Sequence, residues 1–162
     1  MTISVGEKLP SATLCKLGED GPQPVALSSL IEGRKVVIFG LPGAFTGTCS
    51  TAHVPSFMRS VEALKAKGVD EIICVSVNDP FVMAAWDKDT GAGAAGITFL
   101  ADPSSDLTKG IGMDFDVPPI GFSARSKRYA MLAEDGVVKV LNLDEQAGTC
   151  NLSSGETMLD AL

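Results

Sequence analysis

The clearest signal along the chain is a pair of short, continuous apolar stretches, each ended by turn-forming residues. Residues 35–41 read KVVIFGL and stop at Pro42-Gly43, and residues 71–77 read EIICVSV and stop at Asn78-Asp79. Runs of this length that are rich in β-branched residues are typical of strands buried on both faces of a sheet. We therefore expect two buried strands, the first of them central, and a third strand at Ile97–Ala101.

Helical patterns lie between these strands. In residues 49–67 apolar side chains recur at helical spacing, Gly68 stands where a helix C-cap belongs, and Pro55 predicts a kink. Asn78-Asp79-Pro80 is a strong helix start, opening a helix that should run to about Lys88.

Two further apolar segments, 128–133 and 137–143, flank an Asp135-Gly136 pair, which is a strong hairpin signal. Strands connected by helices return parallel, so this order predicts an α/β fold with a mixed central sheet and helices on both faces. A thioredoxin-like three-layer sandwich fits this order. No linker or internal repeat interrupts the pattern, and we expect residues 1–162 to form a single domain.

The charge and composition of the chain limit the kinds of binding partner that we expect. The 162 residues include 13 basic and 20 acidic side chains, giving a net charge of −7. Nucleic acid and anionic membrane surfaces would repel such a surface, so neither is an expected partner. With 45% hydrophobic residues the chain can build a full core and leave apolar surface for a homo-oligomeric contact.

The four cysteines, Cys15, Cys49, Cys74 and Cys150, are too sparse for a disulfide scaffold. The first ten residues lack the basic and apolar regions of a signal peptide, and no stretch has the length of a membrane span. We therefore expect a cytoplasmic protein with free thiols. Cys15, in an early segment expected at the sheet edge, is interpreted as inert.

Two motif matches fail on inspection, and a metal-binding motif is missing. Residues 91–96 read GAGAAG, but a dinucleotide fingerprint needs a strand before it and a helix after it, and here the order is reversed. We expect a flexible connection there. The segment 43–48 resembles a phosphate-binding loop but lacks its lysine. With one histidine, His53, and no CxxC pair, we expect neither a metal nor a cofactor.

Cys49 occupies a more informative position. It follows the first buried strand, at the start of the predicted helix. Ligands bind beyond the carboxyl ends of strands in α/β sheets, and a helix N-terminus with a nearby cation stabilises a thiolate. The alternative is a buried, inert cysteine.

The segment PGAFTGTC (42–49) contains the Pro-x-x-x-Thr-x-x-Cys pattern of the peroxiredoxins, and the chain resembles their type II, peroxiredoxin-5-like class. The resemblance extends over VGEKLP, EALKAKGV, CVSVND, LADP and SKRYAMLAEDGVVK, in the order of that family. It implies a thioredoxin-like fold and a metal-free, cysteine-dependent peroxidase, an antioxidant enzyme that reduces hydrogen peroxide and alkyl hydroperoxides.

By this resemblance Cys49 is the peroxidatic cysteine, Thr46 bonds thiolate and peroxide, Pro42 shields the pocket and Arg128 is the active-site cation. Arg125 is the alternative arginine, and Thr46 has a second interpretation as a helix-capping hydroxyl. The chemistry favours these residue types, because fixed donors stabilise the alkoxide that forms as the peroxide bond breaks, and a guanidinium suits that task better than lysine.

What reduces the resulting sulfenic acid is left open by the sequence. Plant members of the class use a cysteine at the position of Cys74 and animal members one at the position of Cys150. Cys74, placed about four residues before the end of its strand and hence ~13 Å below Cys49, reads equally well as a core residue. Cys150 falls in a loop that we expect to be mobile. We expect external reduction by glutathione or glutaredoxin, with thioredoxin acting through Cys74 or Cys150 as the alternative.

The same residues would also fit two other functions, a cysteine hydrolase and a redox sensor. His53, one turn after Cys49, could serve a cysteine hydrolase, but a histidine satisfied within its helix is the better interpretation. A non-catalytic redox sensor would share the fold and the thiol. Phe45 and Phe81 suggest a homodimer contact, although core packing explains them equally well, and Ile120 and Phe122 are expected near the peroxide pocket.

Overall fold

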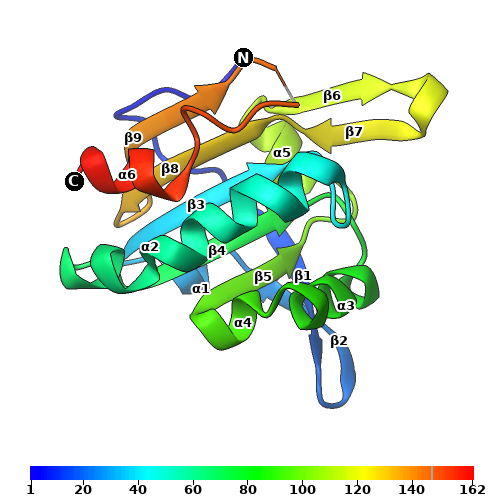
Figure 1. The fold of residues 1–162 in the computed structure, drawn as a ribbon, viewed down its shortest axis with the longest axis horizontal. Helices are drawn as coiled ribbons and strands as arrows, with labels where there is room; N and C mark the ends of the chain where they lie inside the picture. The colour runs from blue at the N-terminus through cyan, green and yellow to red at the C-terminus, as the bar shows by residue number, and fades with distance from the viewer. Residues whose placement is uncertain (147) are drawn as a thin grey trace.

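Seven strands form one mixed sheet whose centre is built from the predicted apolar runs (Figure 1). In this computed structural model, which describes residues 1–146 and 148–162, the strand order is β2-β1-β5-β4-β3-β8-β9. The strands are β1 (Thr13–Gly18), β2 (Gly21–Ala26), β3 (Lys35–Leu41), β4 (Glu71–Ser76), β5 (Ile97–Ala101), β8 (Arg128–Glu134) and β9 (Val137–Asp144). β3, β4 and β5 are parallel, whereas β8 returns antiparallel to β3 and β9 antiparallel to β8.

Helices cover both faces of this sheet, as predicted. The helices are α1 (Ser28–Ile31), α2 (Val54–Ala66), α3 (Pro80–Thr90), α4 (Ala92–Ala95), α5 (Asp106–Gly110) and α6 (Gly155–Asp160). Figure 1 shows α2, α3, α4 and α6 in front of the sheet, with α1 and α5 behind it. Asp79 starts α3 as expected, because its side chain accepts a hydrogen bond from the Val82 amide at 2.8 Å.

Side chains along each strand point alternately to the two faces of the sheet, so the hydrophobic core consists of two clusters, one on each face. In β3, Val37, Phe39 and Leu41 face the α2 side, while Val36 and Ile38 face the opposite side. In β8, Ala130 and Leu132 share the α2 side, so Arg128, two residues before Ala130, belongs to the same face. The strand alternation therefore directs Arg128 toward the helix that follows Cys49.

The N-terminal hairpin was not predicted from the sequence. β2 contains Pro22 and Pro24 and lies at the edge of the sheet, where a missing backbone donor is tolerated. Cys15 lies on β1, paired with Pro24 of β2 and bridged to Ala101 of β5. Its expected place at the sheet edge is therefore wrong, since β2 takes that position.

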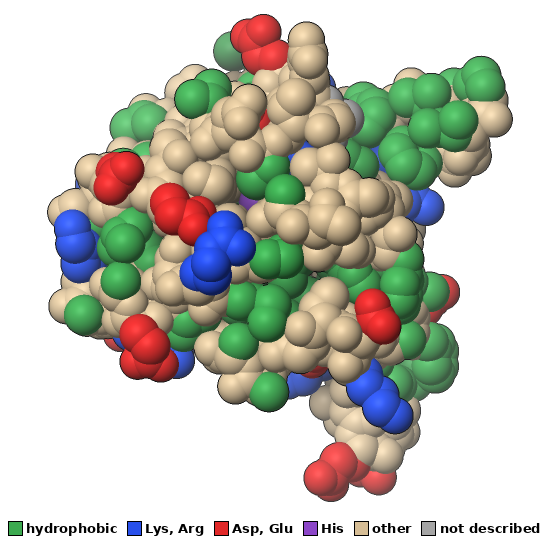
Figure 2. Space-filling view, viewed as in Figure 1, with side chains coloured by type: hydrophobic (Ala, Val, Ile, Leu, Met, Phe, Trp, Pro, Cys, Tyr) green, Lys and Arg blue, Asp and Glu red, His purple; other side chains and the backbone are tan. Residues whose placement is uncertain are grey.

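A second hairpin projects from the body of the molecule. β6 (Asp114–Val117) and β7 (Phe122–Ser126) are joined by the 3₁₀ turn η2 (Pro118–Ile120). Figure 2 shows hydrophobic side chains gathered over this projection, and Ile120 is 63% exposed. Ile120 thus lies at the tip of a protruding arm.

The glycine-rich segment 91–96 forms the short helix α4 between two left-handed glycines, Gly91 and Gly96, rather than a flexible connection. α3 precedes it and β5 follows, the reverse of a dinucleotide-binding unit. Among the described residues no helix is long and apolar enough to cross a membrane.

Candidate active site

The helix that carries Cys49 begins with a wide turn. Residues Cys49–His53 form the π-helical turn η1, and the α-helix α2 follows directly from Val54. Pro55 falls at the start of α2, where the helix changes from π to α, and it has no amide hydrogen to donate to a carbonyl of the preceding turn. The change of helix type from π to α falls at residues 53–54, next to the proline at which the sequence predicts a kink.

Cys49 is buried against a cation. Its side chain is inaccessible to solvent, and its Sγ accepts a hydrogen bond from Nη2 of Arg128 at 3.2 Å. Arg128 is itself 1% exposed. Because β8 runs antiparallel to β3, the first residue of β8 lies beside the last residues of β3, from which the Cys49 loop emerges. This charge partner distinguishes Cys49 from an inert core thiol.

His53 joins this pair, a contact that the sequence did not reveal. Nη1 of Arg128 lies 3.1 Å from Nδ1 of His53, and Nε2 of His53 lies 2.9 Å from the carbonyl oxygen of Ser153. His53 is satisfied, as expected, but by partners far along the chain rather than by its own helix. Burial and the charge of Arg128 lower the pKa of His53 to about 3, so its ring is neutral at physiological pH. The one feature of the sequence that could have indicated this contact is a lone histidine one helical turn after the reactive thiol.

The loop between β3 and η1 has a constrained backbone. Phe45 adopts a left-handed conformation with φ of 63°, which is uncommon for an aromatic residue. The Ala44 amide donates to Oδ1 of Asn78 at 3.0 Å, and the Thr46 hydroxyl donates to the Gly43 carbonyl at 2.7 Å. The Thr46 hydroxyl therefore bonds within the loop, and no side-chain cap hydrogen bond is described at the start of this helix.

The two candidate arginines have different partners. Nη1 of Arg125 donates to the carbonyl of Pro42 at 3.1 Å, and its guanidinium lies 4.9 Å from the centroid of the Phe122 ring. Pro42 is buried, whereas Phe45 is 53% exposed at the surface of the same loop. Arg128 contacts the thiol, and Arg125 holds the loop.

The other cysteines differ in their distance from the reactive end of the sheet. β4 ends at Ser76, so Cys74 lies two residues from the end of its strand, about 7 Å along it, rather than the four residues and ~13 Å expected. Cys74 faces the same side as Cys49, and burial, reinforced by the nearby Cys49, raises the pKa of its thiol well above the usual value. Cys74 is thus a protonated core residue beneath the site.

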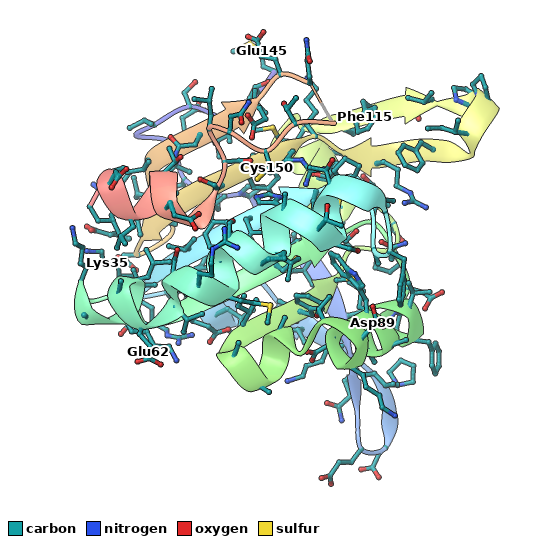
Figure 3. All side chains as sticks on the ribbon, in the orientation of Figure 1. Lys35, Glu62, Asp89, Phe115, Glu145 and Cys150 are labelled. Atoms are coloured by element: carbon teal, nitrogen blue, oxygen red, sulfur yellow. The ribbon has the colours of Figure 1, made fainter. Side chains whose placement is uncertain are left out.

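Cys150 lies on the segment that crosses the sheet between β9 and α6 (Figure 3). It is partly buried, and this burial raises the pKa of its thiol. All four cysteines are free thiols in the structure.

A mixed sheet layered between helices, with a buried Cys–Arg pair at the end of a central strand, defines a thioredoxin-like thiol protein. The redoxin family model matches residues 4–159. Peroxiredoxin-2E-2 of rice, a chloroplastic protein, is 51% identical over 99% of this chain and 73% of its own length. Peroxiredoxin-2B of Arabidopsis thaliana is 46% identical over 99% of this chain and 98% of its own.

Solved structures agree with these relatives. Reduced Prx3 from Vibrio vulnificus in complex with hydrogen peroxide matches with a TM-score of 0.91 and 43% identity, covering 99% of both chains. The chain belongs to the redoxin family, as a type II peroxiredoxin. The predicted thioredoxin-like fold and the predicted family are therefore confirmed, and the protein is a thiol peroxidase.

Proposed function

We infer that Cys49 is the residue that reduces the peroxide and that glutathione, directly or through a glutaredoxin, restores it. The observation that carries the proposal is the 3.2 Å hydrogen bond from Arg128 to the Cys49 sulfur, both side chains being buried. A cation fixed at this distance favours the thiolate, which is the nucleophilic form.

The proposed reaction begins when the Cys49 thiolate attacks one peroxide oxygen. An S–O bond forms, the O–O bond breaks, and the leaving oxygen departs as water or an alcohol after taking up a proton. Arg128 supplies fixed donors for the charge that develops on that oxygen. Thr46 and Pro42 complete the proposed site, Thr46 through a hydroxyl that retains accepting capacity and Pro42 as part of the buried wall.

The state of the other thiols supports external reduction. Burial raises the pKa of both Cys74 and Cys150, so neither is a ready nucleophile toward a sulfenic acid at neutral pH. A first glutathione thiol would condense with the sulfenic acid, releasing water and leaving a mixed disulfide. A second thiol, from glutathione or a glutaredoxin, would then release Cys49 and form a new disulfide. Thioredoxin acting through Cys74 or Cys150 is the alternative.

Peroxide consumption by matched variants tests both parts. Wild type, Cys49→Ser, Cys74→Ser and Cys150→Ser are compared with glutathione plus glutaredoxin and with thioredoxin plus its reductase. Cys15→Ser serves as the control, because Cys15 lies on β1, away from the described contacts of Cys49.

We expect Cys49→Ser alone to lose activity, and glutathione with glutaredoxin to support turnover. Full activity in Cys49→Ser would overturn the mechanism. Loss in Cys74→Ser or Cys150→Ser would identify that cysteine as the resolving residue and contradict external reduction. Normal peroxide oxidation of Cys49 without turnover by either donor would instead support a redox sensor.

We also propose that the protein is a cytoplasmic homodimer. The exposed rings of Phe45 and Phe81, 53% and 60% accessible, support an apolar contact. Sedimentation equilibrium should give twice the monomer mass, and a monomer at micromolar concentration would contradict the dimer. Cell fractionation tests the location, and recovery in an organelle would contradict it.

A further inference from the structure

A carboxylate at the end of β9 binds the segment that follows it. Asp144, 4% exposed, accepts hydrogen bonds from the backbone amides of Leu152 and Ser153, both at 3.0 Å, and from that of Asn151 at 3.2 Å. It also accepts one from the Ser153 hydroxyl. Burial alone would raise the pKa of Asp144, but these hydrogen bonds outweigh it and lower the pKa. Asp144 therefore remains charged at neutral pH and fixes the backbone of residues 151–153.

The fixed segment sets the tautomer of His53. A carbonyl oxygen can only accept, so its 2.9 Å contact with the Ser153 carbonyl requires Nε2 of His53 to carry the hydrogen. Nδ1 is then an acceptor, and it faces Nη1 of Arg128 at 3.1 Å. The ring is held further by Phe39 and Phe57, whose centroids lie 5.0 and 5.7 Å away.

Arg128 transmits this arrangement to the thiol. Nη1 faces His53 and Nη2 donates to Cys49 Sγ, and both nitrogens belong to one rigid planar guanidinium. Fixing one nitrogen therefore aims the other. We propose that Asp144, the 151–153 segment and His53 form a positioning relay that holds the Arg128 guanidinium against the Cys49 thiolate.

Residues 148–155, which include the segment fixed by Asp144, contact both ends of η1. The Thr48 hydroxyl, beside Cys49, donates to the carbonyl of Gly148 at 2.9 Å. At the far end, the Gly155 amide donates to the Ser56 hydroxyl at 2.9 Å, and that hydroxyl donates to the His53 carbonyl at 2.6 Å. Residues 148–155 thus bracket the turn that carries Cys49, so the relay acts on a helix turn that is already held at both ends.

The relay rests on the proposed roles of Cys49 and Arg128. Ionisable groups near the thiol come from several elements: Arg128 from β8, His53 from η1, Cys74 from β4, Asp144 from β9, and Cys150 from the segment itself. Of these, the His53 side chain contacts Arg128 and Asp144 contacts residues 151–153, and neither side chain has a described hydrogen bond to the Cys49 sulfur. Substituting them therefore tests the positioning of Arg128 without removing a group that touches the sulfur.

The test compares His53→Gln with His53→Leu. The glutamine amide has one acceptor and two donors, and can face both Arg128 and Ser153, whereas leucine can face neither. The readout is the rate of Cys49 alkylation by iodoacetamide from pH 4 to 10, followed by mass spectrometry of the Cys49 peptide, together with kcat/KM for hydrogen peroxide. Asp144→Asn and the Asp144→Asn/His53→Leu double variant complete the set.

Asp102→Asn is a matched control for Asp144→Asn. Asp102 is also buried and accepts three backbone amides, from Asp106, Leu107 and Thr108, and the Thr108 hydroxyl. It fixes the start of α5, on the opposite face of the sheet from α2, and should lose comparable stability while leaving the alkylation profile unchanged.

We expect His53→Leu to slow alkylation at pH 7 by about tenfold, the effect of weakening one charge-assisted hydrogen bond. The rate at high pH should not change. Asp144→Asn should act in the same direction, His53→Gln should retain most of the wild-type rate, and the double variant should be no slower than His53→Leu.

A wild-type profile in His53→Leu would overturn the relay, as would equal losses in the glutamine and leucine variants. Fully multiplicative losses in the double variant would also overturn it. Arg128→Lys separates the two proposals. If it leaves the profile unchanged, the proposed role of Arg128 fails. If it slows alkylation while His53→Leu and Asp144→Asn do not, the relay alone fails.

Discussion

Mild acid should destabilise this protein through one residue. His53 is the only histidine in the chain, and burial and Arg128 lower its pKa to about 3 in the folded state. In the unfolded chain it takes up a proton near pH ~6.5. Between these two values the unfolded state binds more protons than the folded state. Stability is therefore greatest above pH ~6.5 and falls as the pH decreases toward 3.

The magnitude follows from the separation of the two pKa values. Each pH unit well inside the window changes the free energy of unfolding by about 1.4 kcal/mol. At pH ~6.5 the slope is half of this, so lowering the pH from 6.5 to 4.5 removes about 2.3 kcal/mol. That is a large share of the ~5–15 kcal/mol typical of a domain. Asp144 contributes with the same sign, but its lowered pKa confines the loss to pH below the usual carboxylate value.

Urea denaturation at pH 7.0, 6.0, 5.0 and 4.5 measures this loss. The parent carries Cys49→Ser, so that ionisation of that thiol contributes nothing, and the comparison protein carries Cys49→Ser with His53→Gln. Glutamine keeps the hydrogen-bonding groups but does not titrate. We expect the parent to lose about 2–3 kcal/mol across the series and the glutamine protein less than about 1 kcal/mol. Parallel losses in the two proteins would refute the assignment to His53.

Two further predictions concern stability alone. Gly40→Ala should lower the free energy of unfolding by about 1–3 kcal/mol in urea denaturation, because the new Cβ would lie 2.3 Å from Cε1 of the buried Tyr129 ring. Gly47→Ala, with open space around its Cβ, should change this free energy by less than about 0.5 kcal/mol. Equal effects of the two substitutions would contradict this packing argument. Arg59→Ala should change stability by less than about 1 kcal/mol in the same assay, since its 2.9 Å ion pair with Glu156 is largely exposed; a larger loss would show that solvent does not screen the pair.

Local patterns were sufficient for much of the fold. The runs that became β3, β4 and β5 are apolar on both faces, and only a sheet covered on both sides buries them. The turn at Asp135-Gly136 has both residues in the left-handed region, as that dipeptide predicts. The β1–β2 hairpin escaped prediction because proline-containing β2 lacks a strand pattern and gains its pairing from its place at the edge.

The sequence by itself determined the family, through PGAFTGTC and the blocks around it, and placed Cys49 at the end of a central strand. Only the tertiary structure decided the contacts of that thiol. Arg128 is 79 residues away and His53 meets Ser153 across 100 residues, so no local pattern encodes either hydrogen bond. The burial that keeps His53 neutral is likewise a property of the packed core, because desolvation exists only once distant elements have assembled around the ring.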